Sequence, residues 1–256
     1  MANYSLEILE NSFQSITLKE MDSVKLMNRT DSKYVFEVAR LNEILDALKD
    51  QYRVLEVSGT RVSRYETLYY DTENFELFFK HLAGKSNRHK IRSRNYVESD
   101  LNFLEAKFKN NKKRTLKNRI KISEISNELH LDEKQSDFLI NETGYEAARL
   151  LPKFWVNYHR ITLVSLERNE RCTIDLGMEF VNDDQVSDFS FLVILELKQD
   201  SATASPISEL MKKLHIRSGG LSKYCLGVVS LNPTIKHNNF KPKLMLINKL
   251  RPNEKN

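Results

Sequence analysis

The chain has 256 residues, of which 40% are hydrophobic and 29% are charged, and its formal net charge is +5 at pH 7. This length allows one large domain or two small ones with a real core, and a content of 7 Gly and 5 Pro excludes collagen-like or low-complexity material. The positive balance indicates an anionic partner without choosing among phosphate compounds, nucleic acid and a membrane surface.

No segment of the sequence reads as a targeting signal or a membrane span. The start, MANYSLEILENSFQSITLKEMD, is acidic and lacks the basic and then apolar pattern of a signal peptide. The longest apolar run, FLVILEL, is too short to cross a bilayer. Cys172 and Cys225 show no disulfide or metal-ligand spacing and are expected to be small buried hydrophobes. We therefore expect a soluble cytoplasmic protein, either free or peripheral at the inner face of the membrane.

Hydrophobic periodicity and turn residues predict the elements of the first part of the chain. In chain order these are a short amphipathic helix over residues 5–20, a strand over 26–38 that carries Lys33, a helix from Leu41 to Lys49, a long strand over 60–72 and a short helix over 73–84 that stops at Gly84.

The second part begins with a highly charged stretch over residues 88–121 that has the spacing of strands. After it the sequence predicts a helical region over 123–150, strands over 153–165, 171–181 and 189–199, a helix over 205–216 with Ser205 as N-cap and Glu209 in its first turn, a short helix over 221–231, and an extended or loosely docked tail from Asn232.

About eight strands in hairpin-like succession favour an antiparallel α+β fold over a doubly wound parallel sheet. We expect three segments: an N-terminal helical segment over 1–24, a main domain over 25–230 and a basic C-terminal tail over 231–256. If the charged faces of the strands point the same way, the sheet either exposes them to solvent or closes into a barrel around a wet, basic lumen.

The charged stretch alternates with a period of two, as a strand with two different faces does. Its charged side chains occupy one parity: Lys90, Arg92, Arg94, Glu105, Lys107, Lys109, Lys117, Arg119 and Lys121. The apolar residues occupy the other: Ile91, Leu104, Ala106, Phe108, Leu116 and Ile120. Like charges that lie opposite each other destabilise a sheet. A bound polyanion would offset this repulsion, since Arg forks and Lys point charges suit phosphate oxygens.

The later strands extend the same surface. Arg160 shares a parity with Tyr158 and Thr162, Arg171 shares one with Thr173 and Asp175, and Glu196 shares one with Lys198. Each row taken alone is typical of a solvated face. Together they favour a binding surface, because solvated faces normally mix charges of both signs. We expect no nucleic acid partner, because the basic residues sit at inward strand positions without interleaved stacking aromatics.

Two carboxylates stand among these cations. Glu105 and Glu196 each precede a lysine by two residues, in EAK and ELK. Such carboxylates either neutralise the neighbouring lysine or hold a hard divalent cation that bridges phosphate oxygens. Phosphoryl transfer depends mainly on positioning and charge neutralisation, so a cationic cage with carboxylate-held metal is sufficient machinery. No Ser-His-Asp arrangement, Walker loop or zinc spacing competes with it.

Nine short motifs carry a resemblance to a known family: SKYVF, LYYDT, KIRSRNY, LEAKFK, KNRIK, YHRIT, CTIDLG, ILELK and LSKYCLG. In order and spacing they resemble the polyphosphate polymerase (VTC) domain of the vacuolar transporter chaperone complex and its bacterial relatives, from about residue 25 to 230. This family belongs to the triphosphate tunnel metalloenzymes, or CYTH-like superfamily. The resemblance implies a closed antiparallel barrel with a basic lumen and helices packed outside.

The resemblance also implies an activity and a set of site residues. The activity is transfer of the ATP γ-phosphate to a growing polyphosphate chain with Mn²⁺ or Mg²⁺, so that ATP and polyphosphate are the expected ligands. The implied catalytic residues are Lys33, Arg92, Arg94, Lys107, Arg160 and Lys223. The implied phosphate-binding residues are Lys117, Arg119, Arg171 and Lys198, with Glu196 and Glu105 as the expected metal ligands.

The sequence departs from the family pattern in two respects. Where the wider superfamily often has an E-x-E-x-K strand, this chain has RTDSKY, which favours the polymerase branch but removes metal-binding carboxylates. The phosphate sensor domain and membrane helices of the eukaryotic complex have no counterpart, so a membrane-protein partner is one option. A triphosphate or nucleoside triphosphate hydrolase and a non-catalytic polyphosphate-binding module remain alternatives in the same fold.

Overall fold

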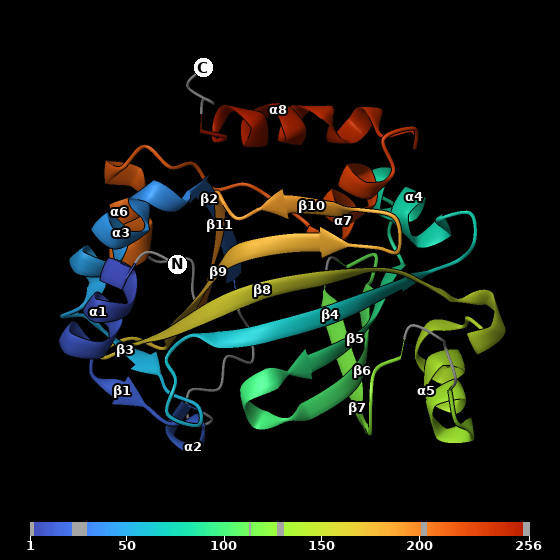
Figure 1. Ribbon diagram of the computed structural model, residues 1–256, viewed down its shortest axis with the longest axis horizontal. Coiled ribbons are helices and arrows are strands. Elements are labelled where there is room, and N and C mark those ends of the chain that lie inside the picture. The colour runs from blue at the N-terminus through green and yellow to red at the C-terminus, as the bar shows by residue number, and fades with distance from the viewer. Residues whose placement is uncertain (1–2, 22–29, 113, 127–130, 201–203, 253–256) are drawn as a thin grey trace.

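The computed structural model describes residues 3–21, 30–112, 114–126, 131–200 and 204–252, and one large curved sheet forms its body (Figure 1). Eight strands follow a single hydrogen-bonded path, in the order β2 (Thr30–Glu37), β11 (Leu192–Gln199), β9 (Glu170–Val181), β8 (Leu151–Ser165), β4 (Ser63–Asp71), β5 (Arg88–Tyr96), β6 (Leu101–Lys109) and β7 (Thr115–Ile122). Three short strands lie beside this path: β1 (Ser15–Ile16), β3 (Tyr52–Leu55) and β10 (Val186–Phe189).

The predicted antiparallel α+β class is confirmed, whereas the predicted closed barrel is not. Every neighbouring pair along the path is antiparallel, and only the short β1–β3 pair is parallel within the described residues. The path starts at β2 and ends at β7, and no described ladder joins these two edges. The sheet is therefore open and curved. We call its concave face the trough.

The described residues form eight α-helices: α1 (Asn3–Ser12), α2 (Leu18–Met21), α3 (Leu41–Leu48), α4 (Glu76–Leu82), α5 (Glu133–Thr143), α6 (Pro206–Lys213), α7 (Lys223–Leu231) and α8 (Lys241–Lys249). None of them is long and apolar enough to cross a membrane. The predicted helix after Ser205 is confirmed, since the Ser205 hydroxyl accepts a hydrogen bond from the Ser208 amide at 3.2 Å.

Two expectations about the chain ends are wrong. The first helix ends at Ser12 rather than continuing to residue 20, because the following segment pairs with β3 through the Val54 amide, 2.8 Å from the Gln14 carbonyl. The tail is not extended: it forms α8, with Phe240 and Ile247 buried against the apolar cluster that also contains α7. Residues 26–29 of the predicted first strand and residues 127–130 of the predicted helical region lie outside the described residues.

Five helices cover the convex face of the sheet, namely α1, α3, α4, α5 and α6, and the trough is left to polar side chains except at the end where α7 packs. On one half, α1, α3 and α6 bury Leu9, Ile44 and Met211 against the apolar parity of β2, β8, β9 and β11 (Figure 1). On the other half, α4 and α5 cover Ile91 and Leu104. The apolar parity predicted from the sequence is thus buried outward, except at Leu116 on the edge strand β7, which is 55% exposed, and the charged parity faces the trough.

A bulge in β9 allows one strand to serve both the trough and the core. Asn157 pairs with Glu179 and Arg160 pairs with Asp175, so β9 holds one extra residue between these pairs, at Gly177. Gly177 has φ +60°, a conformation that L side chains rarely adopt. The shift in parity places Asp175 in the trough and, further along the same face, Phe180 against α7.

Helix α7 packs into one end of the trough. A Cβ atom added at Gly227 would lie 2.3 Å from Cε2 of Phe154 and 2.7 Å from Cδ1 of Phe180. We expect Gly227→Ala to lower the free energy of unfolding by about 1–3 kcal/mol, as overpacking does, which urea denaturation measures. Gly219→Ala is the matched control because nothing lies within 4 Å of its added Cβ atom. Equal stability of the two variants would contradict the close packing of α7 against Phe154 and Phe180.

Candidate functional site

The register of the β5–β6–β7 hairpins confirms the predicted alternation. Residues directly opposite each other in antiparallel strands point to the same face. One row runs Tyr69, Arg92, Glu105, Arg119, and the next runs Lys90, Lys107, Lys117. These rows form one wall of the trough.

The other wall comes from β2, β11, β9 and β8. Lys33 lies opposite Glu196, and Glu196 lies opposite Thr173. The flanking rows place Lys198 opposite Arg171 and Asp175 opposite Arg160. Ten of the twelve site residues expected from the sequence lie in these rows, and Arg94 lies in the next row, opposite Thr67. Lys223 reaches the second wall from α7, where it pairs with Asp175. The roles of all twelve stay predictions.

The two walls are close enough to act on each other electrostatically. Burial lowers the pKa of Lys107 well below its ordinary value, as does Arg92, while Glu196 on the opposite wall raises it. The pKa of Lys90 is lowered by burial and, more weakly, by Lys33 across the trough. Because Lys107 belongs to β6 and Glu196 to β11, the sheet must curve enough to bring these distant strands together.

Glu105 is the buried anion of the first wall. It is fully shielded from solvent, and its carboxylate lies 2.6 Å from the Arg92 guanidinium and pairs also with Lys117. Burial raises the pKa of Glu105, but the nearby cations, Arg92 first among them, outweigh burial and hold the pKa below its usual range. Both cation contacts favour the charge-neutralising alternative for Glu105 over metal binding.

Asp175 plays the same part in the second wall, and sequence reasoning did not assign it to the site. Arg160 grips it through two hydrogen bonds of 2.5 and 2.8 Å, and Lys223 pairs with it from the start of α7. Arg160, Lys223 and their hydrogen bonds hold the pKa of Asp175 below its usual range although burial raises it. The sequence did hold a signal for including Asp175, because Asp175 shares a strand face with Arg171.

Glu196 differs from these two carboxylates because it is open to the trough. Its side chain is 22% exposed and lies 3.1 Å from Lys33 and 3.8 Å from Lys198. Burial raises its pKa, but Lys198 and Lys33 outweigh burial and bring the pKa to about 2. Glu196 is therefore ionised at neutral pH and can meet a cation from the trough.

The donor set fits a metal only in part. Among the described residues, no group of three or more His, Cys, Asp and Glu side chains gathers to hold a metal ion. Mg²⁺ and similar ions are often bound by one or two carboxylates, with substrate phosphates and water completing the shell. Glu196 fits such a site, whereas the shielded, doubly paired Glu105 does not.

Aromatic rings support two of the arginines. The Arg94 guanidinium lies 5.4 Å from the centre of the Tyr65 ring, and that of Arg160 lies 4.8 Å from the same ring. Tyr158 stacks on Tyr65 at 5.2 Å. The expectation that aromatics are not interleaved with the cations is thus wrong at this end. The rings are occupied by guanidinium groups, and Tyr158 is buried, so they offer no free platform for bases.

Buried hydrogen bonds fix the start of α7 in the trough. The Asp71 carboxylate accepts from the Leu77 and Phe78 amides at 2.9 and 3.0 Å, and also from the Tyr224 hydroxyl. Next to Tyr224 stands Lys223, and Lys90 donates to the Ser222 hydroxyl at 3.0 Å. Asp71 therefore joins α4 to α7 and holds Lys223 at its place in the second wall.

Arg119 lies at the margin of the site. It is exposed on the edge strand β7, with its guanidinium 4.2 Å from the centre of the Phe103 ring. Lys117 on the same strand is also exposed at its outer part, with one third of its side chain accessible. The structure thus keeps the predicted phosphate-binding residues of β7 at the open edge of the trough.

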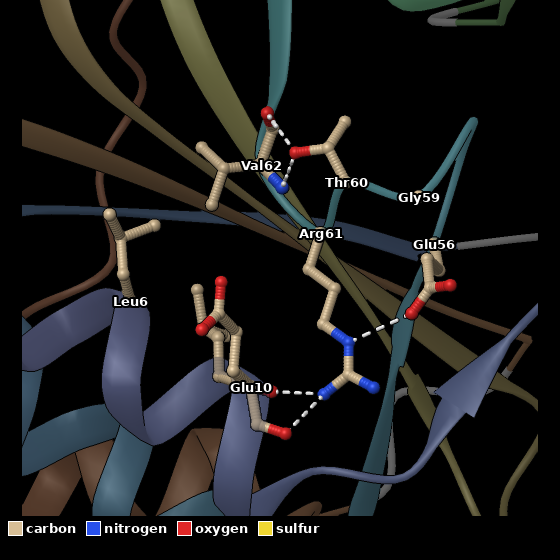
Figure 2. Close-up of a pocket in the computed structure, with 8 residues that line it drawn as sticks. Leu6, Glu10, Glu56, Gly59, Thr60, Arg61 and Val62 are labelled. Carbon is tan, nitrogen blue, oxygen red and sulfur yellow. Dashed lines mark hydrogen bonds and ion pairs between the residues drawn. The ribbon is translucent and has the colours of Figure 1, made fainter.

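A separate pocket lies between α1 and the segment before β4 (Figure 2). Its central side chain, Arg61, donates to the Glu10 and Phe13 carbonyls at 2.9 and 3.1 Å and pairs with Glu56 at 3.0 Å. These carbonyls lie at the C-terminus of α1, where they have no hydrogen-bond donor within the helix, and Arg61 supplies that donor. The pocket is explained by this structural role and is not part of the trough.

The depressed lysine pKa values predict a pH-dependent affinity. Burial lowers the pKa of Lys117 and of Lys198 to about 8 each, from 10.5, with Glu105 and Glu196 opposing it. A phosphate ligand favours the charged lysines, so binding takes up protons above pH 8. We expect tripolyphosphate affinity to fall by on the order of tenfold per pH unit for each such lysine as the pH rises above 8. The free protein, by contrast, gains stability between pH 8 and 10.5, because its unfolded state binds more protons there.

Calorimetry in buffers of different ionisation enthalpy measures this proton uptake directly. Lys117→Met/Lys198→Met is the control, since it keeps the ligand's own titration but lacks both lysines. Equal pH slopes for the double variant and the parent protein would contradict the assignment.

Lys107 is expected to lower the stability of the free protein and to strengthen phosphate binding. No ion pair to it is found among the described residues, and its pKa is lowered well below the ordinary value by burial and by Arg92. We expect Lys107→Met to raise the free energy of unfolding by about 1–2 kcal/mol while weakening tripolyphosphate binding. Lys121→Met, at an exposed position of β7, should leave stability unchanged within about 0.5 kcal/mol. A less stable Lys107→Met protein would indicate that Lys107 is structural.

Comparison with known proteins identifies the family of the chain and structures similar to it. The profile of the VTC domain matches residues 28–232. The adenylyl cyclase candidate HpAC1 of Hippeastrum, for which a dominant triphosphatase activity is described, is similar in structure with a TM-score of 0.50 and 14% identity, over 82% of this chain and 98% of that one. An adenylate cyclase candidate from Bacillus halodurans gives a TM-score of 0.51 and 11% identity, over 77% of this chain and 96% of that one.

These two likenesses bear on the fold alone. A search among curated proteins finds no match. The family profile covers most of the chain and includes all twelve site residues expected from the sequence. The chain belongs to the VTC domain family.

Proposed function

We propose that the protein is a metal-dependent polyphosphate polymerase that transfers the γ-phosphate of ATP to the end of a growing polyphosphate chain. The observation that carries the proposal is the trough itself. Cations from both walls point into it, while Glu105 and Asp175 are each paired with two of these cations at its surface. Such a surface suits a chain of phosphates, whose charge repeats along its length.

Phosphate oxygens are bound by groups that are already held in place. Glu105 orients Arg92 and Lys117, and Asp175 orients Arg160 and Lys223. We assign these two carboxylates as positioning residues, because each touches cations and not the reacting atoms. Preorganised charge costs little further ordering when the transition state forms.

In the proposed step, a terminal oxygen of polyphosphate attacks the γ-phosphorus of ATP. A new P–O–P bond forms, and the bond from the γ-phosphorus to the β–γ bridging oxygen breaks. ADP leaves with that electron pair, so the chain gains one phosphate and no oxidant or other reactant is needed. Lys107, Arg92 and Arg94 bind the oxygens that carry the negative charge, which is the main task in phosphoryl transfer.

Glu196 is the residue that we assign to hold the divalent cation. Its ionised carboxylate faces the trough between Lys33 and Lys198. A bound Mn²⁺ or Mg²⁺ would neutralise negative charge on phosphate oxygens there. Lys33, 3.1 Å from Glu196, would bind phosphate oxygens at the same place.

The proposal is tested by incubating purified protein with ATP and Mn²⁺ or Mg²⁺ and separating the products by gel electrophoresis. A ladder of lengthening chains, formed together with ADP, is expected. Release of orthophosphate without chain growth would select a hydrolase of the same fold. Tight binding of polyphosphate with no turnover by folded protein would select a non-catalytic binding module.

A further inference from the structure

Helix α8 presents an outward face that no other described element covers. Phe240 and Ile247 anchor the helix, being 3% and 1% exposed. On the opposite side, Met245 and Leu246 are 63% and 53% exposed. Figure 1 shows α8 as the outermost element, lying above β10 and away from the α5 end of the molecule.

Lysines surround these two apolar side chains. Met245 stands four residues from both Lys241 and Lys249, so the three lie along one line of the helix surface. Lys243 precedes Leu246 by three residues and is also exposed. We call Lys241, Lys243, Met245, Leu246 and Lys249 the α8 patch.

The segment around the α8 patch carries charge of one sign. Residues 232–252 contain five Lys and Arg residues and no Asp or Glu. The whole chain, by contrast, mixes the signs, with 40 basic and 35 acidic residues. An acid-free, lysine-rich helix face with exposed apolar residues at its centre matches an anionic lipid surface: the lysines meet head groups and the apolar side chains enter the interface.

We propose that the α8 patch binds the protein to an anionic lipid surface. A second copy of the chain fits the patch less well, because two patches of the same charge repel each other and each offers only two apolar side chains. The proposal does not depend on the chemistry of the trough. It places the trough beside a membrane surface without any membrane-spanning helix among the described residues.

Co-sedimentation with phosphatidylcholine vesicles, with and without about 30% phosphatidylserine to make the surface negative, tests the proposal. Saturating tripolyphosphate is present in a parallel set, so that head groups cannot bind through the trough. The full chain is expected to sediment with the anionic vesicles only, and tripolyphosphate should not release it.

The variants separate the α8 patch from general charge. Lys241→Gln/Lys249→Gln is expected to weaken vesicle binding by about 25-fold, at roughly fivefold for each lysine. Lys212→Gln/Lys213→Gln, which removes two exposed lysines from α6, should bind like the parent protein. Met245→Ser/Leu246→Ser should also weaken binding, while Leu151→Ser/Leu166→Ser, at positions 43% and 46% exposed, should not.

Three results of the vesicle experiment would overturn the proposal, and one result without vesicles would do the same. The first is a parent protein that does not prefer anionic vesicles, and the second is unchanged binding by both α8 variants. The third is release by tripolyphosphate, which would assign lipid binding to the trough. A concentration-dependent dimer that Met245→Ser/Leu246→Ser abolishes, seen by light scattering without vesicles, would instead assign the patch to a second copy of the chain and would likewise contradict the proposal.

Discussion

Glu196→Gln is expected to lower the rate of polyphosphate synthesis by about 100-fold or more, which is the scale of losing a preorganised charge at a reacting centre. The amide keeps the shape of the side chain but loses the negative charge that a divalent cation requires. Lys33 and Lys198 are partly exposed, so they lose a partner without becoming isolated charges in a dry core. The fold should therefore persist.

Binding without metal should respond in the opposite direction. The carboxylate of Glu196 repels phosphate oxygens, so Glu196→Gln is expected to bind tripolyphosphate as tightly as the parent protein or more tightly. Steady-state synthesis with Mn²⁺, together with calorimetry in the presence of a chelator, measures the two effects separately. Glu209→Gln, at an exposed position of α6, is the matched control. Parallel loss of binding and turnover would mean that Glu196 has a structural role instead.

Asp175→Asn should have the largest effect on stability. The substitution leaves Arg160 and Lys223 facing each other without their shared anion at a position that is 3% exposed. Removing one partner of a buried ionic group typically costs about 3–5 kcal/mol. For a domain of this size that corresponds to a fall in Tm of roughly 6–20 °C, measured by calorimetry.

Bound phosphate should reverse much of this loss. Tripolyphosphate supplies the missing negative charge, so its stabilising effect on Tm should be greater for Asp175→Asn than for the parent protein. Glu179→Gln, on the exposed side of the same strand, should change neither quantity. If tripolyphosphate raised the Tm of both proteins equally, Arg160 and Lys223 would not be ligands for phosphate.

The sequence predicted the faces of the strands better than their partners. A period of two is a local property, so the parity of Arg92 and Lys107 could be identified without knowing the neighbouring strands. Register is not local. Only the ladder shows that Arg92 and Glu105 lie directly opposite each other and form a buried ion pair. Arg92→Ala therefore affects folding as well as phosphate binding and separates the two less cleanly than Lys33→Ala.

Asp175 illustrates a second limit. Its partners come from β8 and α7, and the alignment with Arg160 depends on the bulge at Gly177. A lone glycine within a strand indicates a bulge without revealing which side chains it realigns. Closure of the sheet could not be derived either, since it depends on whether β2 and β7 meet, and the resemblance to barrel proteins led to an expectation that the ladders do not confirm.

Following phosphorus through the reaction tests the central claim most directly. Purified protein is incubated with ATP and Mn²⁺, and the paramagnetic metal is then removed with a chelator. Internal and terminal polyphosphate, orthophosphate and ADP are quantified together by ³¹P nuclear magnetic resonance. A polymerase predicts one internal or terminal chain phosphate for each ADP formed, with no matching rise in orthophosphate, and loss of this signal in Glu196→Gln. Orthophosphate formed in step with ADP, or no turnover by the folded protein, would contradict the claim.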